Sequence, residues 1–387
     1  MKFNQWTLGL AAVGAVSLAS VVSADEAKVS QVQTALSSTT LSGYVDVAAQ
    51  YNLGNNNFAS TVPIGAGAIS TTANHINSFS LNDVDIALDK PLDESPWASG
   101  YHVDLNYGDD AFKPLGENTP IRQAYVALRT PLGNGIDWKA GVFDNILGYE
   151  SNTYGANPNY TRSYGYWVEP SSYLGLLGSY KITSLISVQA GIANSLPYGN
   201  YNTINPTSTS AKSYLAALAL TAPDSWGFLK GATLNFGVND QVLGSFKPSS
   251  TAEAQQNYYA GFTLPTPVAA LKFGAAFDLI SYANKTVANS KNDSSWIAGV
   301  YTSYQATDKL SLNLRGEFLK DDAGNLLSTG AGNQAEELTA TVQYNLWANV
   351  ISRAEFRWDH AGHGTQFGSN DQNANAYLLA LNLIYQF

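Results

Sequence analysis

Apolar and polar side chains alternate along many short segments of this chain, and this period of two strongly limits its fold. In the segment 310–319, LSLNLRGEFL, three leucines and Phe318 share one face, while Arg315 and Glu317 lie on the other. The chain ends on the same pattern, in 375–387. Successive side chains of a β-strand point to opposite faces, so each segment predicts a strand with one apolar face. Sixteen such segments occur, near 41–53, 76–91, 98–108, 119–131, 135–145, 171–182, 184–196, 212–223, 227–240, 256–265, 268–282, 293–306, 309–320, 334–345, 348–359 and 375–387.

The connections between these segments alternate in length. The short ones are DESPW, LGN, a tight turn near Thr183, APDSW, TP, TD and LW. The long ones are rich in Asn, Gly, Ser and Thr and cover 54–75, 109–118, 146–170, 197–211, 241–255, 283–292, 321–333 and 360–374. Unbroken alternation predicts eight long loops at one end of a sheet, with seven short turns and both termini at the other. Short periplasmic turns and long external loops are typical of bacterial outer-membrane β-barrels.

The composition supports a sheet whose outer surface is not in water. Only 13% of the residues are charged, about half the usual fraction, while 23 Tyr and 8 Trp are present and Cys is absent. Hydrocarbon cannot satisfy free backbone N–H and C=O groups, so a sheet in a membrane closes into a barrel. A soluble β-sandwich or β-helix is the alternative, and it would require a more highly charged exterior.

The N-terminal residues predict export. Lys2 precedes an apolar stretch, Val22-Ser23-Ala24 offers small residues for cleavage, and acidic residues follow, so we expect a signal peptide over 1–24. An uncleaved anchor is the alternative, although the stretch is short for a span. Residues 25–40 predict a short periplasmic segment, and 41–387 a single barrel. Without Lys2 the chain has 19 basic and 30 acidic residues, a net charge of −11, which opposes nucleic-acid binding.

The aromatic C-terminus suggests a membrane rim and an assembly signal. Tyr385 and Phe387 lie on the apolar face of the last predicted strand. Aromatic rings prefer the lipid headgroup layer, so we expect both at the periplasmic rim. A terminal aromatic after alternating apolar residues also resembles the signal that the barrel-assembly machinery reads. The alternative is that Phe387 only caps a strand.

Several stretches resemble one family of bacterial outer-membrane proteins, the OmpL-like β-barrel porins. The similar stretches are TLSGYVDVAAQYNLG, FSLNDVDIALDKPLDESPWASGYHVDLNYGDDA, PIRQAYVALRTPLGNGIDWKAGVFDNILGYE and NYTRSYGYWVEPSSYLGLLGSYKITSLISVQAGIANS. They cover much of residues 40–195, whereas the second half is similar only in style. The resemblance implies an outer-membrane barrel with a pore and no cofactor, and it supports the architecture better than any substrate.

Sixteen strands make a barrel wide enough to hold an aqueous channel. We therefore expect passive diffusion of small hydrophilic solutes or ions. In the general trimeric porins the third long loop folds into the pore, and by analogy we expect 146–170 to narrow this one, in a homotrimer. Packing on a neighbouring subunit and an external lid are the alternatives. The candidate constriction residues are Glu150, Tyr154, Tyr160, Arg162, Tyr164 and Glu169.

Alternation also predicts which charged side chains face the lumen. The main candidates are Asp83, Asp85, Asp104, Arg129, Lys139, Arg315, Glu317, Arg353, Glu355 and Arg357. The others are Asp46, Asp89, Asp137, Asp278, Glu337, Asp359 and Lys272. Eleven acids against six bases predict a mild preference for cations. Acids gather early in the chain and arginines late, so charges of opposite sign facing each other would set up a transverse field.

Other chemistry is weakly supported. His360 and His363 lie in a Gly-rich segment without Cys, which favours a polar loop tip over a metal site, so we expect no metal and no cofactor. An outer-membrane enzyme would need a catalytic constellation at the rim, and no such motif stands out, so we expect no enzyme. A structural or adhesive barrel is the stronger rival, distinguished by the absence of conductance. The expected partners are membrane lipid, lipopolysaccharide, small solutes and the assembly machinery.

Overall fold

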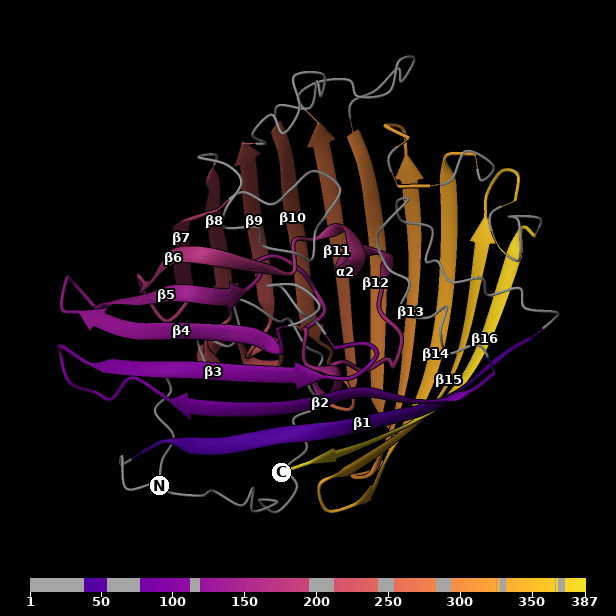
Figure 1. Ribbon diagram of the computed structural model, residues 1–387, viewed down its shortest axis with the longest axis horizontal. Coiled ribbons are helices and arrows are strands. Elements are labelled where there is room, and N and C mark those ends of the chain that lie inside the picture. Colours follow the sequence, from indigo (N-terminus) through magenta and orange to yellow (C-terminus); the bar gives the residue numbers. More distant parts are fainter. Residues whose placement is uncertain are drawn as a thin grey trace.

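The chain closes into one barrel of sixteen antiparallel strands in chain order, in which β1 pairs with β16 (Figure 1). This computed structural model describes residues 38–53, 77–111, 119–194, 212–242, 254–282, 294–324, 326–327, 332–365, 367 and 373–387. The strands are β1 (Thr40–Asn52), β2 (Phe79–Lys90), β3 (Ser99–Tyr107), β4 (Ile121–Thr130), β5 (Ile136–Asp144), β6 (Ser172–Lys181), β7 (Ile186–Asn194), β8 (Lys212–Thr221), β9 (Thr233–Val242), β10 (Ala254–Pro265), β11 (Leu271–Tyr282), β12 (Ser294–Gln305), β13 (Leu310–Asp321), β14 (Gln334–Trp347), β15 (Val350–Ala361) and β16 (Asn375–Gln386). The predicted fold class is confirmed.

The ring is closed at the C-terminus of the chain. The N–H of Phe387 donates to the carbonyl of Gly43 at 3.0 Å, and the N–H of Gly43 donates back to the carbonyl of Phe387 at 3.0 Å. A side chain at Gly43 would lie 2.8 Å from the Phe387 ring and 2.1 Å from the Asp85 carbonyl. Only glycine therefore lets the terminal ring approach β1 and β2 this closely.

All sixteen predicted segments contain a strand, and one boundary is wrong by several residues. The segment predicted over 227–240 becomes a strand only at Thr233. A 3-10 helix, η3 (Asp224–Leu229), occupies the residues before it and lengthens the connection from β8. The apolar pattern of Trp226, Phe228 and Leu229 belongs to this connection, where Trp226 and Phe228 are exposed.

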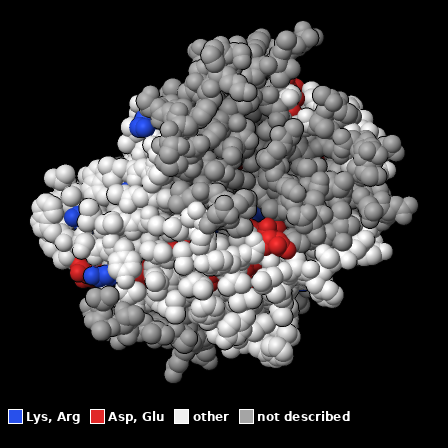
Figure 2. Space-filling view, viewed as in Figure 1, with Lys and Arg blue, Asp and Glu red and all other residues white. Residues whose placement is uncertain are grey.

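The predicted alternation is confirmed along the clearest strands. On β13, Leu312 and Leu314 point outward and are 43% and 48% exposed. The next residue, Arg315, points inward and is fully buried. On β16 the exposed residues are Tyr377, Leu379, Leu381, Leu383 and Tyr385. The described part of the face seen in Figure 2 carries few charged side chains. Such an apolar exterior is stable against hydrocarbon and not against water.

Two β-bulges break the alternation on the wall built by β1–β4. The register between β1 and β2 shifts after the pair Asp46 and Asp83, so Asn82 and Asp83 are both buried. The register between β3 and β4 shifts after the pair Asp104 and Gln123, so Arg122 and Gln123 are both buried. A bulge sets two residues against one on the neighbouring strand. These bulges add polar side chains to the lumen.

The helices of the described residues are short, and none is long and apolar enough to cross a membrane. The predicted signal peptide over 1–24, and all but the last three residues of the segment 25–40, lie outside the described residues. Much of the long connections also lies outside them, but the connection between β5 and β6 is described throughout.

Candidate functional site

The connection between β5 and β6, residues 145–171, runs inside the barrel, and we call it the inner loop. The N–H of Asn145 donates to the carbonyl of Ser171 at 3.0 Å, which joins the two ends of the inner loop. Its first residues are apolar and pack on inward-facing side chains of the wall. The buried cluster contains Phe143, Ile146, Leu147, Tyr149, Tyr173, Leu177, Ala193, Leu215, Ala217, Ala219, Tyr259, Ala276 and Tyr301. The base of the inner loop is therefore held by apolar burial rather than by charge.

A stacked pair of tyrosines fixes the turn after this base. The rings of Tyr149 and Tyr301 lie 3.8 Å apart between centroids, at 16° to each other. Tyr301 belongs to β12 and is 2% exposed. Aromatic stacking adds about 0.5–1.5 kcal/mol to the burial of the rings. The contact sends the next residues of the loop toward β13.

A short helix, α2 (Tyr164–Val168), lies on the inner face of β11 and β12, inside the ring of strands (Figure 1). Its N-cap is Ser163, whose hydroxyl oxygen accepts from the Tyr166 N–H at 3.0 Å. The carboxylate of Glu317 on β13 accepts from the Tyr164 N–H at 2.5 Å and from the Gly165 N–H at 3.1 Å. Free N–H groups at a helix start favour a negative partner. Glu317 thus binds the loop backbone to the wall.

Arg315 joins the inner loop to two strands at once. Its guanidinium donates to Glu150 at 2.7 Å, to the Thr161 carbonyl at 2.7 Å and to Glu337 on β14 at 2.8 Å. A further bond reaches the Arg162 carbonyl at 3.2 Å. The side chains of Arg315, Glu150 and Glu337 are at most 2% exposed. Removing one partner of such a buried pair costs about 3–5 kcal/mol.

Two arginines of β15 continue this attachment. Arg357 donates to the Arg162 carbonyl at 2.6 Å and forms a bidentate pair with Asp359 at 2.8 Å for each bond. Arg353 donates to the carbonyls of Asn157 and Tyr154, the second at 3.3 Å.

Glu355, also on β15, binds the loop through backbone N–H groups. Its two carboxylate oxygens accept from the Tyr160 N–H at 2.6 Å and from the Thr161 N–H at 2.9 Å. The Thr161 hydroxyl donates to the same side chain at 2.6 Å. Charge-assisted hydrogen bonds are about twice as strong as neutral ones. Together with Arg315, Arg353 and Arg357, Glu355 makes the inner loop part of the β13–β15 wall.

Tyrosines of the inner loop complete the attachment. The Tyr164 hydroxyl donates to Asp359 at 2.7 Å, and Gln50 of β1 donates to the Tyr160 hydroxyl at 2.7 Å. The Tyr154 hydroxyl donates to the carbonyl of Asp110, just beyond β3, at 3.2 Å. The loop therefore touches the wall on β1 and near β3 as well as on β13–β15.

Glu169, at the end of the inner loop, is surrounded by other carboxyl groups. It is 5% exposed and lies close to Asp278 of β11, with Glu150 and Glu317 nearby. Burial, and then the charge and hydrogen bond of Asp278, raise the pKa of Glu169 well above its usual value. A neutral Glu169 can donate a hydrogen bond to Asp278, and the pair then holds the loop end against β11.

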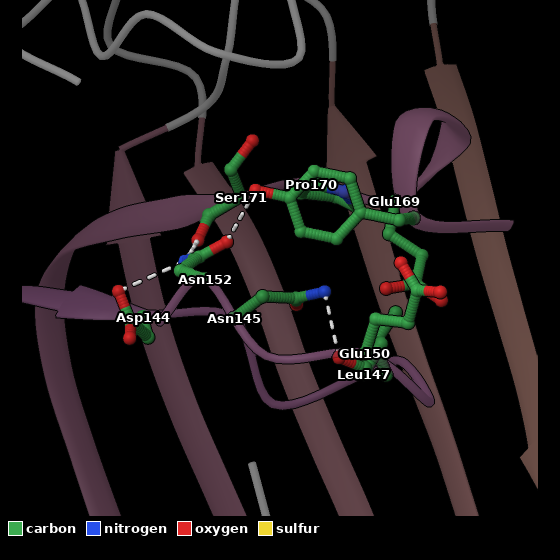
Figure 3. Close-up of a pocket in the computed structure, with 9 residues that line it drawn as sticks. Asp144, Asn145, Leu147, Glu150, Asn152, Glu169, Pro170 and Ser171 are labelled. Atoms are coloured by element: carbon green, nitrogen blue, oxygen red, sulfur yellow. Dashed lines mark hydrogen bonds between the residues drawn. The ribbon is translucent and has the colours of Figure 1, made fainter. Parts of the chain in front are cut away.

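A pocket lies at the base of the inner loop, beside Glu169 (Figure 3). Asn152 crosses it, and its amide donates to Asp144 at 3.0 Å and to the Ser171 carbonyl at 3.1 Å (Figure 3). The other lining residues are Asn145, Leu147, Glu150, Tyr166, Glu169 and Pro170. The lining combines carboxylate and amide groups with the apolar side chains of Leu147 and Pro170.

The β1–β4 wall carries buried acids, which we call the acidic wall: Asp46, Asp83, Asp85 and Asp104. Asp46 accepts from Asn82 and Asn382 through one oxygen only, and Asp83 accepts from Tyr44 and Asn106 through one oxygen only. The second oxygens of Asp46 and Asp83 have no hydrogen-bond partner among the described residues.

Arg122 pairs with acids of the acidic wall on β2 and β3. Arg122 donates to Asp104 at 2.7 Å and to Asp144 at 3.0 Å, and its Nε lies 3.8 Å from Asp85. Alternation from Arg129 places position 122 on the outer face, and the bulge of β4 brings it inside. The inward direction of Arg122 could have been predicted from its charge, because a charged side chain on a lipid-facing position is costly.

The remaining predicted lumen charges lie away from the inner loop. Arg129 pairs with Asp137 at 2.6 Å near the short turns, and Lys139 lies 4.6 Å from the ring centre of Tyr125. His102 bonds Asp89 at 3.0 Å. In the described part of the chain, no group of three or more His, Cys, Asp or Glu side chains could hold a metal ion.

The predicted transverse field is wrong for the arginines of β15. β15 is separated from β1 only by β16, so Arg353 and Arg357 lie near the acid of β1 rather than across the barrel from it, whereas Arg315 on β13 lies further round the ring. Arg315 and Arg357 are also paired with Glu337 and Asp359, so little of their charge is left to act across the lumen. The sequence analysis did not predict that acids beside Arg315 and Arg357 would pair with them.

Several solved structures share this fold. The outer-membrane channel DcaP of Acinetobacter baumannii has a TM-score of 0.60 at 11% identity, over 92% of this chain and 99% of that one. OmpF of Salmonella typhi, in complex with daunomycin, has a TM-score of 0.61 at 11% identity, over 90% and 97%. OmpT of Vibrio cholerae, in its trimer form, has a TM-score of 0.56 at 14% identity, over 90% and 99%. At these identities the likeness shows the fold alone.

No curated protein matches the sequence. A family model does, over residues 38–387, and its description is "Putative beta-barrel porin-2, OmpL-like". The match covers all sixteen strands and the inner loop. The family and the fold are those of porins, and the protein is located in the bacterial outer membrane. The chain belongs to the OmpL-like family of β-barrel porins.

Proposed function

We propose that this porin lets small hydrophilic solutes or ions diffuse passively through a water-filled channel, which the inner loop narrows. The observation that carries the proposal is the attachment of Arg315 to Glu150, Thr161 and Glu337. A barrel of sixteen strands is wide enough for an aqueous channel, and a loop fixed across it reduces the free section. Long loops held in place by buried bonds are usually functional.

The width of the passage can be tested by solute entry into liposomes. We expect the wild-type protein to admit small sugars and to exclude large oligosaccharides. The double variant Arg315→Gln and Arg357→Gln leaves Glu150 and Glu337 unpaired, so the inner loop should detach and larger sugars should enter. Arg129→Gln is the matched control, because Arg129 pairs with Asp137 away from the loop. An unchanged size limit in the double variant would contradict the constriction.

We also propose a mild preference for cations. The buried acids Asp46 and Asp83 have unpartnered oxygens among the described residues, whereas Arg315 and Arg357 are neutralised by neighbouring acids. Rings of carboxylates favour cations in a pore. Reversal potentials across a salt gradient measure this directly, and clear anion selectivity would refute it.

A homotrimer is proposed for the assembled protein, by analogy with the trimer form of the similar OmpT structure. The apolar outer band would face membrane lipid and, in the outer leaflet, lipopolysaccharide. Residues 1–24 are proposed as a cleaved signal peptide, and Tyr385 and Phe387 as the signal for the barrel-assembly machinery. The mass of the detergent-extracted protein, with its N-terminal sequence, tests the trimer and the cleavage together.

A structural or adhesive barrel is the second candidate function. The observation in its favour is the burial of the lumen side chains, since Arg315, Asp83 and Asp359 are fully enclosed. A purified protein that folds but never conducts would support this candidate over the porin.

A further inference from the structure

The connection between β8 and β9 is an ordered segment at the short-turn end of the barrel, and we call it the β8–β9 hook. It covers residues 222–232, includes η3, and is the longest connection at that end. The Ala222 N–H donates to the Ala232 carbonyl at 2.8 Å, and the Gly231 N–H donates to the Ala222 carbonyl at 3.0 Å. These two hydrogen bonds close the base of the hook, so its backbone holds one shape.

Two aromatic side chains of the hook are exposed. Trp226 is 51% exposed and Phe228 is 58% exposed. Gly227 between them has a φ of 61°, which glycine adopts without strain, and a Cβ there would have no neighbour within 4 Å. The backbone is therefore ordered while both rings lie open. Large apolar side chains that are exposed together mark an interaction surface.

The hook adjoins the apolar outer surface of the barrel. Leu234, near the start of β9, and Leu264, near the end of β10, point outward and are each 37% exposed. The hook also contacts β10. It therefore lies at the edge of the surface that faces lipid, where hydrocarbon gives way to headgroups. Tryptophan is enriched in this layer because its ring is amphipathic.

The charged residues of the hook also suit a lipid interface. Lys230 and Asp224 pair at 3.0 Å, and their side chains are 63% and 83% exposed. An ion pair this exposed contributes little to stability. Lys230 can therefore leave Asp224 for the phosphate of a phospholipid at little cost, while the stem of its side chain stays along the apolar surface.

We propose that the β8–β9 hook anchors the barrel in the periplasmic leaflet of the membrane, with Trp226 and Phe228 among the phospholipid headgroups and Lys230 on a phosphate. The short turns of outer-membrane barrels face the periplasm. Segments that combine exposed aromatic rings with lysine bind in the plane of the interface. The inference rests on the outer-membrane location and the apolar outer face, and it does not require that the barrel conduct.

Nitroxide labels on single cysteines locate the hook relative to lipid. The sequence has no Cys, so each introduced cysteine is the one labelling site in the chain. Phe228→Cys and Trp226→Cys report on the hook, in the full chain folded into phospholipid vesicles. Leu381→Cys is the reference for lipid, because this residue is 64% exposed in the outer row of β16. Asp308→Cys is the matched control, because it is exposed in the connection between β12 and β13 at the same end, which has no large apolar side chain.

The measurement compares collisions of each label with oxygen, which concentrates in hydrocarbon, and with a nickel chelate, which stays in water. We expect the oxygen-to-nickel ratio at both hook positions to be severalfold higher than at 308 and lower than at 381. A ratio at either hook position equal to that at 308 would overturn the inference, because the hook would then lie in water, open to a periplasmic protein. A ratio at 381 as low as that at 308 would instead contradict the membrane-spanning barrel on which the porin proposal depends.

Discussion

At the scale of single residues, charged groups in this barrel are used mainly to hold the inner loop. The hydrogen bonds of Arg315, Arg357 and Glu355 go to the inner loop or to acids beside the arginines. Buried pairs of this kind are weak contributors to net stability but fix one geometry. Glu169 differs from them, because the charged groups that raise its pKa, namely Asp278, Glu150 and Glu317, are all acidic.

Glu169 makes the attachment of the inner loop depend on pH. Its pKa is raised by burial, and then by Asp278, with Glu150 and Glu317 adding to the effect. The attached loop therefore binds this proton more tightly than the detached loop does. The stabilisation of the attached loop by this proton is fully present below the ordinary glutamate pKa. It is lost as the pH rises through the raised pKa of Glu169. We expect the single-channel conductance to increase reversibly as the solution is made alkaline.

The matched variant for this prediction is Glu169→Gln, which keeps the shape and a hydrogen-bond donor but cannot ionise. Its conductance should stay constant over the pH range in which that of the wild type increases. Identical pH profiles for the two proteins would mean that another group controls the response, or that the loop does not move.

Alternation predicted the inward direction of Arg315, Glu317, Arg353, Glu355 and Arg357, because a period of two assigns each side chain to a face. It could not predict their partners. The partners are backbone groups of the inner loop, about 150 to 200 residues away in sequence, and they come near only when the ring closes. Arg122 was missed because a bulge is invisible to a strict period.

At the scale of elements, β16 shows how a strand is matched to the membrane. Its outer face is a continuous apolar row, and Leu381 at the middle is 64% exposed. Its inner face contains Asn382, which donates to Asp46. The sequence alone predicts both faces, because leucine and tyrosine alternate here with smaller or polar residues. For β9 the same rule fails at the start, since η3 also contains aromatic residues.

A charge in the outer row of β16 should cost most at its middle. Leu381→Lys is expected to lower the free energy of unfolding by about 2–4 kcal/mol, the range for a cation at the bilayer midplane. Tyr377→Lys, near the end of the strand, is the matched control and should cost about 0–1 kcal/mol. Urea titration of the protein folded in lipid vesicles measures both. Equal costs would show that the strand does not cross the membrane with this face in lipid.

At the scale of the whole molecule, the barrel follows from local sequence patterns, whereas the path of the inner loop inside it follows from long-range contacts. Local sequence patterns predict the sixteen strands and the alternation of short and long connections, and the closed ring follows from them. The path of the inner loop depends on contacts with β1 and with β10–β15, which no local pattern encodes. Its aromatic composition indicated an ordered loop but not its course.

The proposed channel requires a sixteen-strand ring that holds water and a loop that narrows it. Single-channel conductance in planar lipid bilayers, for the wild type and for a variant lacking residues 150–166, tests both parts in one measurement. We expect discrete conductance steps from both proteins, with larger steps from the variant, because its passage is wider. Steps of equal size would contradict the constriction, and the absence of steps from both folded proteins would contradict the channel itself.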